Sequence, residues 1–338
     1  MTDRSGFALV MAMLLVLALM VMAMGMLAVG TREAWIAAAG ARHAQATRAA
    51  EGAVLRTVAA WSTRDVAALD VRGSFTPGDP RGVDIERVDS GLFVVAATGR
   101  VPGPGGSVTA RAALLVRVLH PDRLASSFPA AVSAAGAVTV PEGSVSGGGD
   151  ACGDPGPGIM APIATIDPGA AVDGDPPVAY RLPPAPAAPD PFDPGTAAGL
   201  AAIHHPGGTV TPAPLATAGE CVPGAGNWGS PDPAHPCFRL LPLIVAPDLV
   251  MDGGMAHGVL VVDGDLRLTG GAHFDGLIAV RGRLDLDAGS TVRGAVRAGS
   301  VVSAGRILRN ACAIRRGVSA PAFDGPFRPP ERWWIPMF

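Results

Sequence analysis

Residues 259–306 read VLVVDG, DLRLTG, GAHFDG, LIAVRG, RLDLDA, GSTVRG, AVRAGS and VVSAGR, which are eight consecutive units of six residues. The sixth place of most units holds glycine, and the second and fourth places are mostly apolar. Because side chains alternate between the two faces of a strand, the second and fourth places share one face. A glycine-rich corner lets a short strand bend and begin another. The repeat predicts a parallel β-solenoid with three units in each coil.

An earlier copy of the repeat, AVSAAG, AVTVPE and GSVSGG, occupies residues 131–148. One coil cannot bury a core alone, so we expect it to stack on the coils of residues 253–310. Residues 149–252 then become an insertion, which holds 21 of the 33 prolines. So much proline opposes regular sheet or helix over most of that length. Two interpretations stay open: a large surface loop, or a small irregular module tied by cysteines.

The chain has four cysteines, Cys152, Cys221, Cys237 and Cys312, and they allow three pairings. Cys221 and Cys237 are close in sequence and both lie in the insertion, so we favour that disulfide. It leaves Cys152, just after the first coil, to pair with Cys312, just after the last. Free or metal-bound thiols are the alternative. No CxxC pair occurs, so we expect no metal site.

Three segments before the repeat alternate apolar and polar residues, and they are 83–88, 92–101 and 107–119. Turn signals rich in glycine, proline and aspartate separate them. The pattern predicts a small antiparallel sheet within residues 63–120. A sheet of this size needs a cover, and a preceding helix can supply it.

The stretch FALVMAMLLVLALMVMAMGMLAVG, residues 7–30, has no charge and no proline. A helix of that length covers roughly 36 Å, enough to cross a bilayer. Residues 31–61 continue as an alanine-rich segment without proline, so we predict one helix over residues 7–62. Its weakly apolar stripe consists of Ile36, Ala39, His43, Ala46, Ala50, Val54, Val58 and Trp61. A cleaved signal peptide and a plain single-pass anchor are two interpretations of the apolar stretch.

A third interpretation rests on the residues around this stretch. A leader of residues 1–6, MTDRSG, ends in glycine and is followed by Phe7 and an unbroken apolar helix. This resembles the class III signal of type IV pilins and type II secretion pseudopilins. The resemblance implies that a prepilin peptidase cuts between Gly6 and Phe7 and methylates Phe7. Residues 44–53, AQATRAAEGA, also resemble a stretch of PilX-type minor pilins, and the likeness extends over roughly residues 1–120.

The chain departs from the pilin pattern at Met11, where most family members carry glutamate. PilX-type minor pilins and the K-type pseudopilin share this lack, and the latter is placed at a filament tip. The resemblance therefore implies a minor subunit that primes or caps a type IV pilus or a secretion pseudopilus. Its partners are other pilin-like subunits through the helix, the prepilin peptidase and the bacterial inner membrane. Such a subunit crosses that membrane once with its C-terminal part periplasmic, and is extracellular within a filament.

The remaining features favour a structural protein over an enzyme. The net charge is −3, so we expect no nucleic-acid partner. We find no catalytic motif and predict no cofactor. Two other functions are a membrane-anchored β-solenoid that binds or modifies carbohydrate, and a bactofilin-like scaffold. Acids and bases alternate along the repeat and favour a solvated face: Asp263, Asp265, Asp275, Asp285 and Asp287 with Arg267, Arg281, Arg283 and Arg293.

The fold class predicted is α+β: a long helix, a small antiparallel sheet, then a short parallel solenoid with a proline- and glycine-rich insertion. Residues 311–338 form an aromatic C-terminal tail. We expect this tail to cover an open end of the solenoid, whose unpaired strands would otherwise invite aggregation. A partner contact is the alternative.

Overall fold

The structure is a computed structural model. It describes residues 5–60, 74–75, 82–89, 91–103, 106–118, 124–184, 190–201, 203–323, 326–327 and 334–335. The chain divides into two compact units. The helix–sheet unit consists of residues 1–61, 67–116 and 330–338, and the parallel-sheet unit of residues 62–66 and 117–329. Together they contain one long apolar helix, a small antiparallel sheet and a large parallel sheet, so the α+β class is confirmed at that level.

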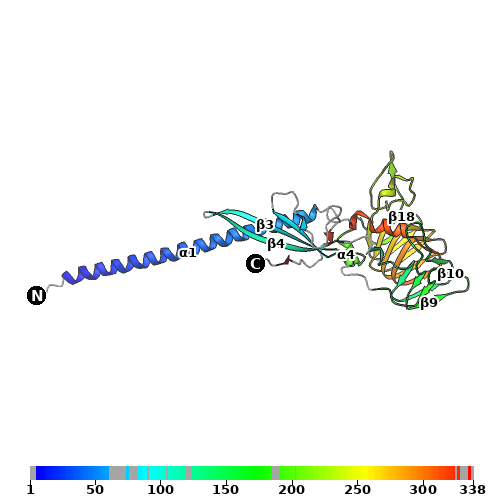
Figure 1. Cartoon of the computed structure of the whole chain (residues 1–338), viewed down its shortest axis with the longest axis horizontal. Coiled ribbons are helices and arrows are strands. Elements are labelled where there is room, and N and C mark those ends of the chain that lie inside the picture. Colours follow the sequence, from blue (N-terminus) through cyan, green and yellow to red (C-terminus); the bar gives the residue numbers. More distant parts are fainter. Residues whose placement is uncertain are drawn as a thin grey trace. The chain divides into compact units, whose positions relative to one another are not determined.

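The helix–sheet unit begins with α1 (Ser5–Ala59), a helix of 55 residues (Figure 1). No proline interrupts it, and alanine, leucine and methionine, which are strong helix formers, supply much of its length. The predicted stripe is only partly correct. Ala46, Ala50, Val54 and Val58 are buried, whereas Ile36 is 64% exposed. Ala39 and His43 are also exposed, and Trp61 lies outside the described residues.

The antiparallel sheet contains the three predicted strands, β2 (Val83–Asp89), β3 (Leu92–Gly103) and β4 (Gly106–Val118). Three two-residue strands extend it, and the sequence analysis missed them. They are β1 (Ser74–Phe75), β23 (Pro326–Phe327) and β24 (Trp334–Ile335). Both β23 and β24 pair with β4. The expectation that the tail covers the parallel strands is therefore wrong for these two segments, and residues 324–325, 328–333 and 336–338 of the tail lie outside the described residues.

The large parallel sheet has three rows of strands. The first row joins β12 (Ile203–His204), β16 (Leu243–Ala246), β18 (Met255–Val262), β20 (His273–Leu286), β21 (Thr291–Ser303), β5 (Val132–Ala134), β8 (Ile159–Met160) and β11 (Val178–Ala179). The second joins β13 (Gly208–Val210), β17 (Leu249–Asp252), β19 (Leu266–Thr269), β20, β21, β6 (Ala137–Val140) and β9 (Ile163–Ile166). The third joins β18, β20, β21, β22 (Arg306–Arg309), β7 (Ser144–Ser146) and β10 (Ala171–Asp173).

The register of these rows follows the predicted repeat. Leu260 lies beside Ile278, and Ile278 beside Val296, each 18 residues along the chain. Residues 131–148 pair with β21 and β22, so the early copy does stack on the later repeat.

The structure corrects one part of the prediction for the insertion. Most of residues 149–252 is irregular, as predicted, but short strands within it join the parallel sheet, and β8, β9, β10 and β11 extend that sheet at one end. At the other end β12, β13, β16 and β17 extend it. Prolines lie at strand ends there, as in Pro162 and Pro168 around β9, where a missing N–H removes no bond of the strand interior.

The second and fourth places of the repeat fill the inner core, as predicted, except in the last unit, where the register shifts and Val301 is buried in place of Val302. Leu260, Leu266, Phe274, Ile278 and Val292 are all fully buried or nearly so in one cluster. At about 25 cal/mol for each square ångström of apolar surface, this burial is the main force that stabilises the parallel sheet.

A second apolar cluster covers the outer face of the first row, and the sequence analysis missed it. It contains Val259, Val261, Leu277 and Ala295, which occupy the first and third places of every third unit. The helix α5 (Ala311–Val318) supplies Ile314 and Val318 to it. Residues 311–318, predicted as part of a tail, are therefore a helix packed on the sheet.

A crossing segment, residues 190–201, joins the two ends of the stack over this same face and carries α4 (Pro194–Ala198). Its Phe192 packs edge-on against Phe128 in the second cluster. Asp190 accepts a hydrogen bond of 2.6 Å from Arg297, whose guanidinium also lies over Phe192. The crossing explains how the chain leaves one end of the stack at β11 and resumes at β12.

Candidate functional site

The N-terminal part of α1 is the largest exposed apolar surface among the described side chains. From Val10 to Val29 the large apolar side chains are 54–73% exposed. One helix in the described part of the chain is long and apolar enough to cross a membrane. Met11 is 54% exposed on it. Gly6 and Phe7 lie within α1, but their side chains are outside the described set.

The C-terminal part of α1 packs closely on the sheet through Gly99 of β3. A Cβ built on Gly99 would come 2.0 Å from the Ala46 carbonyl oxygen and 2.7 Å from the Ala50 amide nitrogen. Only glycine permits this backbone-to-backbone approach. Ala46 and Ala50 are fully buried there. One continuous helix thus has a packed half and a bare half, and the boundary lies near residue 45.

Both disulfides join the cysteines that the sequence analysis favoured. Cys152 is bonded to Cys312, and Cys221 to Cys237. Asp150 accepts hydrogen bonds from the amide nitrogens of Cys152 (2.8 Å) and Cys312 (3.2 Å), so its carboxylate fixes both sides of the first bond. Asp150 and the two sulfur atoms lie close enough together to resemble a metal site. The two sulfur atoms are bonded to each other in the disulfide, so neither is a thiolate that could bind a cation.

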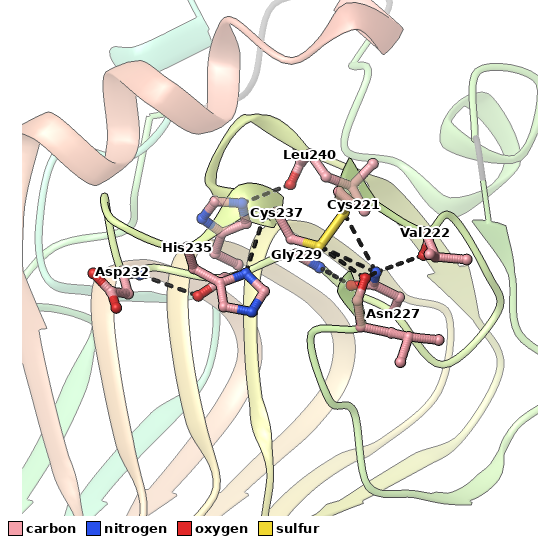
Figure 2. The surroundings of a disulfide bond; sticks show 11 residues. Cys221, Val222, Asn227, Gly229, Asp232, His235, Cys237 and Leu240 are labelled. Carbon is pink, nitrogen blue, oxygen red and sulfur yellow. Dashed lines mark hydrogen bonds between the residues drawn. A yellow bond between two sulfur atoms is a disulfide. The ribbon is translucent and has the colours of Figure 1, made fainter. Parts of the chain in front are cut away.

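The Cys221–Cys237 disulfide organises the end of the stack near β12 and β13. Figure 2 shows Asn227 beside the sulfur atoms, with its amide nitrogen 2.7 Å from the Val222 carbonyl oxygen. The same nitrogen lies 3.4 Å from the Cys237 sulfur. The Asn227 side-chain oxygen accepts from the Gly229 amide at 3.1 Å (Figure 2). These bonds hold the loop that carries the next residue in the chain, Trp228.

Trp228 closes the inner core at this end. It is fully buried within the core cluster, and its indole nitrogen donates to the Ala225 carbonyl oxygen at 2.8 Å. Its own carbonyl oxygen accepts from the His257 amide, so it continues the third row. The sequence offered one signal for this role: a single tryptophan between the two cysteines of the insertion.

A polar cluster lies on the third row, where the buried His257 and Asp275 are neighbours in register with the exposed Arg293. The His257 Nε2 donates to the Leu240 carbonyl oxygen at 2.6 Å, and its Nδ1 has no partner within the described part of the chain. The pKa of His257 is lowered to about 4, chiefly by burial; the hydrogen bond to Leu240 opposes the shift, and the nearby Arg316 charge adds to it. The imidazole is therefore neutral at pH 7 and ties the disulfide-bonded end to the sheet.

Asp275 is 5% exposed, and its carboxylate lies 3.7 Å from the guanidinium groups of both Arg293 and Arg316. Burial raises the pKa of Asp275, and the two arginines oppose that rise. Burial has the opposite effect on the neighbouring His273, because it lowers the pKa of that imidazole. The Arg316 guanidinium also lies 4.6 Å from the Phe238 ring centre. The cluster thus joins α5, the sheet and the disulfide-bonded loop.

No family model, curated protein or solved structure matches this chain. Its function must therefore be argued from the geometry of its own residues.

The acids of the repeat have structural partners. Asp248 accepts from the Asp265 amide at 2.7 Å, and Asp265 accepts from the Arg283 amide at 2.7 Å. Each carboxylate therefore holds the corner of the next layer. Asp285 pairs with Arg283 at 2.7 Å and with Arg267 at 3.8 Å. An open hollow between them is lined by the same carboxylates, already engaged in these bonds.

Proposed function

We propose that this chain is a pilin-like minor subunit, anchored in the bacterial inner membrane by α1 and carrying a short β-solenoid on its exported part. One observation carries the proposal. A single unbroken helix is bare and apolar over its first half and packed on an antiparallel sheet over its second. A helix of this kind can reside in lipid before assembly and against other helices afterwards.

Three further observations support the proposal. Gly6 directly precedes Phe7 and the apolar stretch, as the proposed cleavage requires. Met11 replaces the usual glutamate, which favours a priming or capping position over a repeated one. The rows of parallel strands, at offsets near 18 residues, support a solenoid, and the two disulfides suit an oxidising compartment.

The mass of the mature N-terminal peptide tests the proposal. The protein is purified from its native host with and without prepilin peptidase, and its first peptide is weighed. We expect Phe7 to be the methylated N-terminus in the first strain and Met1 to remain in the second. Intact Met1 in both strains would identify a plain anchor, and a cut beyond residue 30 a signal peptide. Either result overturns the proposal.

A matched pair of variants separates processing from membrane insertion. Gly6→Val places a bulky residue before the cut and should leave the leader attached, while the chain still partitions into membranes. Gly25→Val makes the same change within the helix, where an added Cβ meets no atom within 4 Å. That variant should be processed normally.

A further inference from the structure

The two ends of the parallel stack differ. At the disulfide-bonded end Trp228 is fully buried and closes the core. At the other end β9, β10 and β11 are the last strands of their rows, and each pairs on one side only within the described part of the chain. We call these three strands and residues 180–182 the open end.

The backbone of the open end presents unpaired groups at defined residues. In a parallel pair, successive residues direct their N–H and C=O groups to opposite sides of the strand. The amides of Asp167 and Ala171 donate inward, to Val140 and Gly143. The residues next to them in β9 and β10, Ile166 and Val172, therefore direct their backbone groups away from the stack. These backbone groups form a template on which one more parallel or antiparallel strand can pair.

Exposed apolar side chains lie beside this template. Ile163 is 60% exposed, Ile166 37%, Tyr180 68% and Leu182 65%. Val172 belongs to the inner core but is only partly buried there. The core therefore reaches solvent at the open end through Val172, whereas at the other end the fully buried Trp228 lies over it beside the partly buried Ile203 and Val210.

The charge around the open end is negative. Residues 142–182 contain six acids and one base, Arg181, which gives a net charge of −5. The acids are Glu142, Asp150, Asp154, Asp167, Asp173 and Asp175. Two copies that met at this end would bring two such charges together, which opposes self-association. A cationic segment would be attracted instead.

We propose that the open end binds an extended segment of a partner protein in which apolar residues alternate with lysine or arginine. The segment adds a strand beyond β9 and β10, its backbone pairs with Ile166 and Val172, and its apolar side chains cover the exposed end of the core. Its cations lie beside Asp167 and Asp173. This inference does not depend on the fate of the N-terminal helix.

Binding of a designed peptide to the full chain in a neutral detergent tests the proposal. The probe is a fluorescein-labelled decapeptide of alternating valine and lysine, followed by fluorescence anisotropy. A second peptide has every other amide methylated, and a third carries glutamate for lysine. We expect saturable binding of the first peptide. We expect at least about tenfold weaker binding of the methylated one, which loses several backbone hydrogen bonds, and none of the third.

Two double variants with equal charge change locate the site. Asp167→Asn with Asp173→Asn should weaken binding about fivefold, as for two exposed charge contacts. Glu33→Gln with Glu220→Gln should leave binding unchanged. Raising the salt concentration should weaken binding to the unmodified chain, which tests the charge contact without any variant.

Several results would overturn the proposal. They are absence of saturable binding, equal binding of the methylated peptide, and equal affinity of the two double variants. A fourth is a dimer of the unmodified chain in sedimentation that Ile163→Lys abolishes, because the occupant of the open end would then be a second copy.

Discussion

The two units of this protein differ in how far they bury their apolar side chains. The parallel-sheet unit buries an inner and an outer apolar cluster and holds both disulfides. The helix–sheet unit buries a short stripe of alanine and valine on β3 and leaves α1 exposed from residue 10 to about residue 45. Apart from its open end, the parallel-sheet unit is complete within one chain. In the helix–sheet unit the apolar N-terminal part of α1 is exposed to solvent.

Removal of the disulfides should cause the largest loss of stability of the changes considered. We expect only the parallel-sheet unit to lose stability. Cys152 and Cys312 are 160 residues apart, and Cys221 and Cys237 are 16 apart. By chain entropy the first bond contributes about 5 kcal/mol and the second about 3 kcal/mol. Calorimetry of Cys152→Ser with Cys312→Ser should show one lowered transition and an unmoved one for the helix–sheet unit. A larger loss from the shorter loop, or movement of both transitions, would contradict the comparison.

Acidification should lower the free energy of unfolding of the parallel-sheet unit, because His257 is protonated more readily in the unfolded chain. Its pKa is about 4 in the folded protein and about 6.5 when unfolded, so the unfolded chain binds more protons between these values. The stabilisation is complete above pH 6.5 and is lost as the pH falls toward 4. The full difference is roughly 3 kcal/mol.

Urea unfolding at pH 7 and pH 4.5 measures this loss. Asp275 acts in the opposite sense, because its raised pKa favours folding at low pH. The comparison is therefore made with His257→Gln, which should lose most of the pH dependence, and with the exposed His43→Gln, which should keep it. Identical pH dependence in all three chains would mean that His257 does not titrate as described.

Two glycine substitutions should change the stability of the helix–sheet unit in opposite directions. Gly99→Ala forces α1 away from β3 and should cost about 2 kcal/mol. Gly40→Ala lies in the bare half, where an added Cβ meets no atom within 4 Å. It should stabilise the helix by about 1 kcal/mol, because alanine has the higher helix propensity. Thermal unfolding followed by circular dichroism measures both, and equal effects would remove the distinction between the halves of α1.

The repeat was predictable because its apolar places and glycine corners recur every six residues, and the rows of strands follow that spacing. The outer cluster was missed, although the first place of every third unit is apolar, as at Val259, Leu277 and Ala295. The strands between residues 149 and 252 were missed because proline at strand ends hides a short strand. Gly99 could not be found from sequence, since its role depends on where α1 crosses β3.

Photo-crosslinking along α1 tests the central claim most directly, that the bare half of this helix is an association surface. A photoreactive phenylalanine replaces Ile36 in one chain and Leu215 in another, which are exposed apolar residues of the two units, 64% and 56% exposed. Both chains are irradiated in membranes of the native host. We predict crosslinks from position 36 to pilin-like subunits and none from position 215. A membrane-bound chain that forms no protein crosslink at position 36 would contradict the claim and leave α1 a plain anchor.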